Sequence, residues 1–83
     1  MTIHVSCRLF GKYAEVVGAE TAAVDLPDGS SVAAALARLR EILPRGESIP
    51  LKTMVAINQE HALPTRVLVD GDELALLPPL AGG

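Results

Sequence analysis

The part of the sequence best suited to chemistry is its end, Pro78-Pro79-Leu80-Ala81-Gly82-Gly83. Proline lacks an amide hydrogen and holds φ near −65°, so the two prolines should end a strand and favour an extended exit. Six extended residues reach at most about 20 Å, far enough to enter a pocket on another protein. Gly82 and Gly83 have no β-carbon and can thread a channel too narrow for a side chain. We therefore predict an extended, flexible tail over residues 78–83.

The carboxylate of Gly83 is the candidate reactive group. An α-carboxyl group with a pKa of about 3.5 is an anion at pH 7 and a poor electrophile, so it must be activated first. Adenylation with ATP is the usual route, and the chain has neither a phosphate-binding loop nor a candidate catalytic pair. We therefore expect another protein to activate it, and the chain not to be catalytic alone. The activated acyl group could accept sulfur or an amine. The alternative is a frayed terminus without a role.

Composition narrows the class of protein further. The 83 residues indicate one domain, and 49% hydrophobic residues allow a core without a metal or a disulfide. A net charge of −3 and only two aromatic residues, Phe10 and Tyr13, argue against nucleic-acid binding. No apolar run approaches the roughly 20 residues of a membrane span, and the N-terminus does not resemble a signal peptide. We predict a cytoplasmic protein that binds neither nucleic acid nor membrane.

Other polar or reactive residues are weaker candidates. Cys7 alternates with apolar residues, which favours a buried side chain over a reactive thiol. The acidic cluster at 70–73 could suggest a metal, but it has too few ligands for a calcium loop, so we expect a turn with solvated acids. His4 and His61 are expected at the surface without partners. Neither Lys12 nor Lys52 is assigned a role.

The hydrophobic pattern predicts the elements that carry the tail. Residues 2–10 alternate as a strand that leaves Phe10 on the outer face, and residues 20–27 form a second strand ending at Pro27. A helix capped by Ser30 or Ser31 should run to about Leu43. Further extended segments are expected at 54–58, 67–69 and 73–77, with 11–19 forming one or two helical turns and 59–66 a loop. This order predicts an α+β fold in which one main helix packs across a mixed sheet of four or five strands.

Short motifs follow one another in a recognisable order along essentially the whole chain. They are Phe10-Gly11, Glu15-Val16-Val17-Gly18, Leu26-Pro27-Asp28-Gly29, Val55-Ala56-Ile57-Asn58, Asp70-Gly71-Asp72-Glu73-Leu74-Ala75 and the ending Pro78-Pro79-Leu80-Ala81-Gly82-Gly83. Each motif is weak alone, and the ordered set is specific. Through this set the chain resembles the small subunits of molybdopterin synthase, the MoaD type of the ubiquitin-like sulfur carriers. The resemblance implies a β-grasp domain over residues 1–77.

The resemblance also implies a mechanism and partners. A ubiquitin-activator-like adenylating enzyme would use ATP to adenylate Gly83, which then becomes a thiocarboxylate and donates sulfur to cyclic pyranopterin monophosphate in the large synthase subunit. The expected assembly is a heterotetramer of two small and two large subunits, and the chain itself binds no cofactor or metal. Gly82 would give clearance in the channel. The implied partner contacts are Phe10, Leu77, Pro78, Pro79, Leu80 and Ala81; for Phe10, packing in the core or against the hairpin is the alternative.

Three other functions remain open from the sequence. One is a sulfur carrier for thiamine or cysteine biosynthesis; the Pro78-Pro79 step is unlike thiazole carriers, whereas cysteine-pathway carriers are harder to exclude. Another is a ubiquitin-like modifier joined to lysines, which would share the adenylation step and the diglycine ending. The last is a plain β-grasp interaction module, in which the diglycine ending would be incidental.

Overall fold

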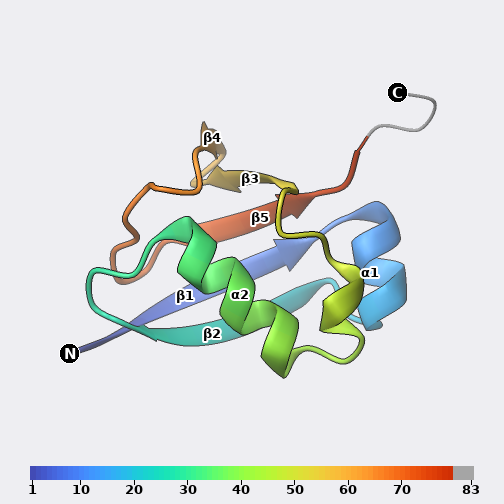
Figure 1. Ribbon diagram of the computed structural model, residues 1–83, viewed down its shortest axis with the longest axis horizontal. Coiled ribbons are helices and arrows are strands. Elements are labelled where there is room, and N and C mark those ends of the chain that lie inside the picture. Colours follow the sequence, from blue (N-terminus) through green and yellow to red (C-terminus); the bar gives the residue numbers. More distant parts are fainter. Residues whose placement is uncertain (80–83) are drawn as a thin grey trace.

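The fold is a five-stranded mixed sheet with helices on one face (Figure 1). The computed structural model describes residues 1–79. The strands are β1 (Thr2–Leu9), β2 (Thr21–Pro27), β3 (Met54–Ile57), β4 (Glu60–Ala62) and β5 (Glu73–Leu77). The helices are α1 (Gly11–Val17), α2 (Val32–Ile42) and the 3₁₀ turn η1 (Gly46–Ser48).

The sheet has the strand order β2-β1-β5-β3-β4. The first and last strands, β1 and β5, lie side by side and parallel at its centre, while all other pairs are antiparallel. With α2 packed across this sheet, the predicted α+β β-grasp architecture is confirmed. In the described chain, α1 adds a second, short helix at the position where one or two helical turns were expected.

Helix α2 begins and ends where the sequence predicts. The side chain of Ser31 caps it by accepting a hydrogen bond of 3.2 Å from the Ala34 amide. Val32, Leu36 and Leu39 recur at helical spacing and are buried. Pro44 follows the C-cap residue, so the helix ends at Ile42.

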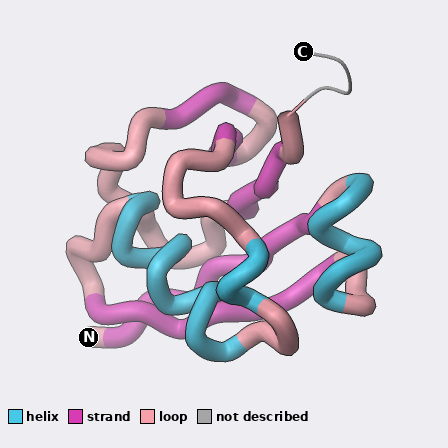
Figure 2. The backbone as a smooth tube through the Cα atoms, turned by 45° about the vertical axis from the view of Figure 1, so that its right-hand side comes forward, coloured by secondary structure: helices cyan, strands magenta, loops and turns pink. Residues whose placement is uncertain are grey.

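The core lies between the helices and one face of the sheet (Figure 2). Along β1, buried and exposed residues alternate strictly, because successive side chains of a strand point to opposite faces. The inward residues Ile3, Val5, Cys7 and Leu9 meet residues of both helices, including Tyr13 of α1. The burial predicted for Cys7 is confirmed. The outward residues of β1 belong to the opposite face of the sheet, here called the outer face.

The edge of the sheet beyond β3 differs from the prediction. The short strand β4 lies at Glu60–Ala62, inside the segment expected to be a loop. The segment expected to be extended at 67–69 makes only an isolated bridge between Val67 and Ser31. The reason is the sharp turn at Asn58 and Gln59, which both take positive φ values and fold the chain straight back onto β3.

Asp72 is buried, so the expectation of a turn with only solvated acids was wrong at this residue. It is 5% exposed, and its two carboxylate oxygens accept hydrogen bonds from the Val69 amide at 2.9 Å and from Asn58 Nδ2 at 3.0 Å. The Asn58 side-chain oxygen in turn accepts from the Glu73 amide at 3.0 Å. This network ties the turn before β5 to the turn after β3, and so fixes where β5 begins.

His4 is exposed, as predicted, but it has a partner that the sequence did not reveal. Its Nδ1 lies 2.6 Å from Asp25 Oδ1 on the neighbouring strand β2. This hydrogen bond, and the charge of Asp25, raise the pKa of His4 above its ordinary value of 6.5. Among residues 1–79, none of the helices is long and apolar enough to cross a membrane.

The Asp72 network yields a stability prediction. Asp72→Ala removes the acceptor of two partly buried donors, so the variant should lose about 2–3 kcal/mol of unfolding free energy. Urea unfolding followed by circular dichroism measures this loss. Asp28→Ala, which removes an exposed carboxylate from another turn, is the matched control and should shift stability by less than about 0.5 kcal/mol. Equal losses in the two variants would contradict the role given to the buried carboxylate.

Candidate functional site

The carboxyl ends of the two central strands form the candidate site. In the parallel pair, Leu9 of β1 lies opposite Leu76 of β5, so the next residues, Phe10 and Leu77, leave the strands at the same edge of the sheet. Leu9 and Leu76 point into the core, which places Phe10 and Leu77 on the outer face. Figure 1 shows this end of β5 at the opposite side of the molecule from the N-terminus. The fold therefore brings together two predicted contact residues that are far apart in sequence.

Phe10, Met54 and Leu77 make an apolar surface at this edge, here called the outer patch. Met54 is paired with Leu77 across β3 and β5 and is 53% exposed. Phe10 is 39% exposed, so the alternative of a core phenylalanine does not hold. The Arg8 guanidinium lies 5.5 Å from the centroid of the Phe10 ring, a cation–π contact that holds the ring in place. Met54 was missed from the sequence, where it looked like one more buried residue of its strand.

The base of the tail rests between α1 and the segment before β3. A β-carbon at Gly11, whose φ is +51°, would lie 3.4 Å from Pro78 Cγ, so Pro78 packs closely on this glycine. Pro79 lines a shallow pocket with Tyr13, Pro50 and Lys52. Lys52 thus lies beside the start of the tail, although the sequence assigned it no role. The remaining predicted site residues, Leu80, Ala81, Gly82 and Gly83, lie outside the described residues.

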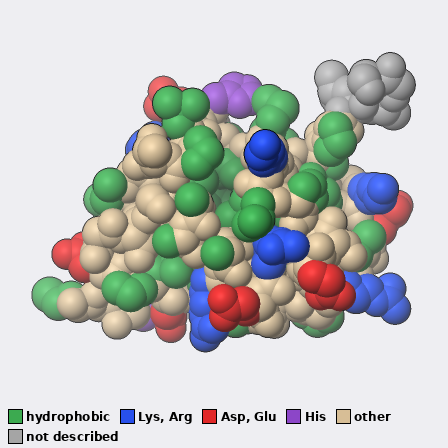
Figure 3. Space-filling view, in the orientation of Figure 1, with side chains coloured by type: hydrophobic (Ala, Val, Ile, Leu, Met, Phe, Trp, Pro, Cys, Tyr) green, Lys and Arg blue, Asp and Glu red, His purple; other side chains and the backbone are tan. Residues whose placement is uncertain are grey.

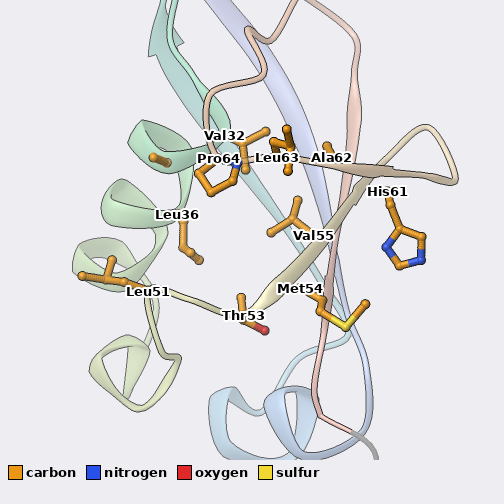
Figure 4. A pocket seen from close by; sticks show the side chains of 11 residues that line it. Val32, Leu36, Leu51, Thr53, Met54, Val55, His61, Ala62, Leu63 and Pro64 are labelled. Carbon is orange, nitrogen blue, oxygen red and sulfur yellow. The ribbon is translucent and has the colours of Figure 1, made fainter.

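A second hollow lies on the helix-covered side of the sheet, between α2 and the β3–β4 edge (Figure 4). It has a volume of about 240 Å³ and mostly apolar walls. Leu51 and Leu63 are more than half exposed around it, and Met54 of the outer patch reaches only its rim. Figure 3, which views this side, shows hydrophobic side chains gathered over the same part of the molecule. Among the residues that line it, His61 is the titratable one, and the others are mainly apolar.

The described residues offer little for catalysis by this chain itself. Residues 1–79 contain no cluster of three or more potential metal ligands. Cys7 is 1% exposed, and burial raises the pKa of its thiol to about 12. Because the thiolate is the nucleophilic form, Cys7 cannot relay sulfur at neutral pH. What the described residues show at this edge of the sheet is an apolar surface beside the start of the tail.

The chain is similar in sequence to known proteins along most of its length. The model of the ThiS family matches residues 7–83. A molybdopterin synthase sulfur carrier subunit from Chlamydomonas reinhardtii is 37% identical over 83 residues, which covers 98% of this chain and 100% of that protein.

Two solved structures are also similar. Small archaeal modifier protein 1 from Haloferax volcanii is 34% identical, with a TM-score of 0.85 over 94% of this chain and 99% of that one. A chain in the complex of subunits 1 and 2 of molybdopterin-converting factor from Helicobacter pylori is 26% identical, with a TM-score of 0.65 over 98% of this chain and 100% of that one. The fold is thus found in both kinds of protein.

The burial of Cys7 leads to a labelling prediction. In the native protein at pH 8, iodoacetamide should leave the Cys7 thiol almost unmodified, because the group is both inaccessible and protonated. In concentrated urea the same thiol should be alkylated at the rate of a free cysteine. Mass spectrometry over a time course measures both rates. Fast labelling of the folded protein would show that Cys7 is a reactive thiol after all.

Proposed function

The chain belongs to the ThiS family, as a ubiquitin-like sulfur carrier of the MoaD type, and on that basis we propose that it is the sulfur carrier subunit of a molybdopterin synthase. The main support for the proposal is the position of the end of β5. Leu77 is the last residue of that strand, beside the exposed Phe10 and Met54, and Gly83 follows six residues later (83 − 77 = 6). A partner that docks on the outer patch thereby lies within about 20 Å of the terminal carboxylate.

The proposed reaction uses Gly83 as a reusable acyl group. Attack of its carboxylate on the α-phosphate of ATP, in an adenylating partner, forms the glycyl adenylate and releases pyrophosphate. Hydrosulfide, or a protein-bound equivalent, displaces AMP and leaves a thiocarboxylate, the 1-thioglycine form. The thiocarboxylate sulfur then attacks a carbon of cyclic pyranopterin monophosphate and displaces the oxygen bonded to that carbon. Water cleaves the acyl–sulfur bond, so the sulfur stays on the pterin and the Gly83 carboxylate returns. Gly82 provides the clearance that the active-site channel requires.

The outer patch and the tail residues from Pro78 to Ala81 are proposed to contact both partners in turn. The large synthase subunit is one partner, which the similarity to the Helicobacter pylori complex supports. The ubiquitin-activator-like enzyme is the other, and it would supply the ATP site that this chain lacks. We propose an assembly of two small and two large subunits, with residues 1–77 as the docking domain and 78–83 as the extended tail. The cytoplasmic location stays a prediction.

A ubiquitin-like modifier is the second candidate function. The similarity to small archaeal modifier protein 1, at 34% identity, favours it directly. Both functions begin with the same adenylate and differ only in the nucleophile, which is sulfide for a carrier and a lysine amine for a modifier. The Chlamydomonas reinhardtii relative favours the molybdopterin route, also over carriers for thiamine or cysteine biosynthesis. A denaturing gel of host lysate separates the two, because a modifier gives a ladder of high-mass adducts.

Deletion of Gly83 should abolish sulfur transfer and leave the fold intact. The deletion removes the acyl group that is activated, and the described domain contains none of the residues affected. The measurement is restoration of molybdoenzyme activity in a host that lacks its own carrier subunit. An added alanine after Gly83 is the matched control, because it keeps every residue but blocks the terminal carboxylate, and it should fail equally. Activity with either variant would overturn the carboxylate mechanism.

Phe10→Ala should weaken binding to the large subunit. A partly exposed aromatic ring in an apolar patch has the character of an interface hot spot, so its removal should raise Kd by about 10-fold or more. Isothermal titration with the purified large subunit measures the effect. Val69→Ala, which truncates an exposed side chain near the start of β5, should leave Kd unchanged. Equal effects of the two substitutions would show that the interface lies elsewhere.

A further inference from the structure

A chain of two hydroxyl groups ends on the last carbonyl of β5. Thr53 Oγ1 donates a hydrogen bond of 2.9 Å to the Leu77 carbonyl oxygen. Tyr13 Oη lies 2.7 Å from the same Thr53 oxygen. The hydrogen of the Thr53 hydroxyl goes to the carbonyl, which can only accept, so the Tyr13 hydroxyl must be the donor of the second bond. The order of donation is therefore Tyr13 to Thr53 to Leu77.

We propose that Tyr13 and Thr53 are positioning residues that set the direction in which the tail leaves the domain. This inference rests on the proposed function, in which the tail must enter a partner's active site. Three features of the chain connect the hydroxyl bonds to the direction of the tail.

The first feature is the peptide bond between Leu77 and Pro78. A peptide unit is planar, so the Leu77 oxygen lies in one plane with the nitrogen and Cα of Pro78. Holding that oxygen from one side fixes the orientation of the plane, and therefore the vector along which the chain continues.

The second feature is the proline pair. Pro78 and Pro79 have no amide hydrogens, so this strand cannot continue its pattern of backbone donors past Leu77. At the last residue of the strand, the Thr53 side chain donates a hydrogen bond to the Leu77 carbonyl oxygen. Each proline also has a fixed φ, and Leu77, as the residue before a proline, is restricted to extended conformations. These restrictions carry a direction set at Leu77 as far as Pro79.

The third feature is the rigidity of the two donors. Tyr13 lies on α1, is 4% exposed and belongs to the hydrophobic core. Thr53 directly precedes β3, and its amide donates to the Pro50 carbonyl at 3.3 Å. Pro78 also packs on Gly11, which lies two residues before Tyr13 in α1. The base of the tail is therefore held by α1 on one side and by the segment before β3 on the other.

Loss of the hydroxyl bonds should change how readily the tail is captured more than how fast it reacts. A freely rotating Leu77–Pro78 peptide plane must be ordered again each time a partner binds the tail. Ordering one backbone residue is unfavourable enough to raise KM by roughly 5- to 10-fold. Once the tail is seated, the acyl chemistry is unchanged, so kcat should stay near the wild-type value.

The test uses the activating enzyme purified from the same organism and ATP–pyrophosphate exchange with the full-length chain as the acyl substrate. Thr53→Val removes the hydroxyl at nearly the same volume and should raise KM with little change in kcat. Thr53→Ser keeps the hydroxyl and should restore KM. Tyr13→Phe should give a smaller rise, and the double variant Tyr13→Phe/Thr53→Val should be no worse than Thr53→Val alone. Thr21→Val, at an exposed threonine of β2, is the matched control and should behave as wild type.

Two results would overturn the inference. One is an unchanged KM in Thr53→Val, and the other is the same KM rise in Thr53→Ser as in Thr53→Val. A purely structural role would instead lower the active fraction and kcat in step with the urea midpoint, which is measured in parallel.

A second readout does not depend on the proposed function. The ¹⁵N order parameter of the Leu77 amide should fall in Thr53→Val and recover in Thr53→Ser. If the wild-type chain is not adenylated at all, the proposed function fails, and this NMR comparison alone decides whether the hydroxyl bonds hold the end of β5.

Discussion

The parallel pairing of β1 and β5 is the constraint on which the rest of the structure depends. It places the end of the first strand and the end of the last strand at one edge of the sheet. From this follow the position of α1, which starts there with Gly11, and the outer patch, which needs Phe10 from one strand and Leu77 from the other. Parallel neighbours require a crossover connection. The chain between β1 and β5 supplies it, and α2 within that connection covers one face of the sheet. The other face carries no helix within the described chain.

The same pairing leaves the packed core and the proposed reactive carboxylate in different parts of the molecule. The core residues and the buried Cys7 lie on the helix-covered face, where the thiol pKa of about 12 keeps sulfur unreactive. The proposed reactive group instead lies at the end of the chain, beyond two prolines that end backbone pairing. In the proposed function, a partner would process the terminal carboxylate without disturbing the packed domain. What the domain must provide is a docking surface and a defined exit, and the hydroxyl bonds from Tyr13 and Thr53 act at that exit.

The sequence predicted the elements with strong local signals and missed those that depend on contacts between distant residues. Strict alternation in β1 and the Ser31 cap of α2 were read correctly, because each is set by neighbours in the chain. Strand β4 was missed because it depends on a turn at Asn58 and Gln59, residues not usually expected at positive φ in succession. The buried carboxylate of Asp72 looked like a turn residue, since its partner Asn58 is 14 residues away. In the site, Phe10 and Leu77 were found by resemblance, whereas Met54 and the Thr53 bond needed the register of β3 against β5.

In this account the chain works as a sulfur carrier through an acyl group that two different partners handle in turn. The most direct measurement is the intact mass of the protein purified from its own host under non-reducing conditions, with a sample treated with hydroxylamine for comparison. We expect a fraction whose mass exceeds the sequence mass by the difference between sulfur and oxygen, with the added mass located at Gly83 by fragmentation. A chain that is never found with sulfur at that residue, but is found joined through Gly83 to lysines of other proteins, would contradict it.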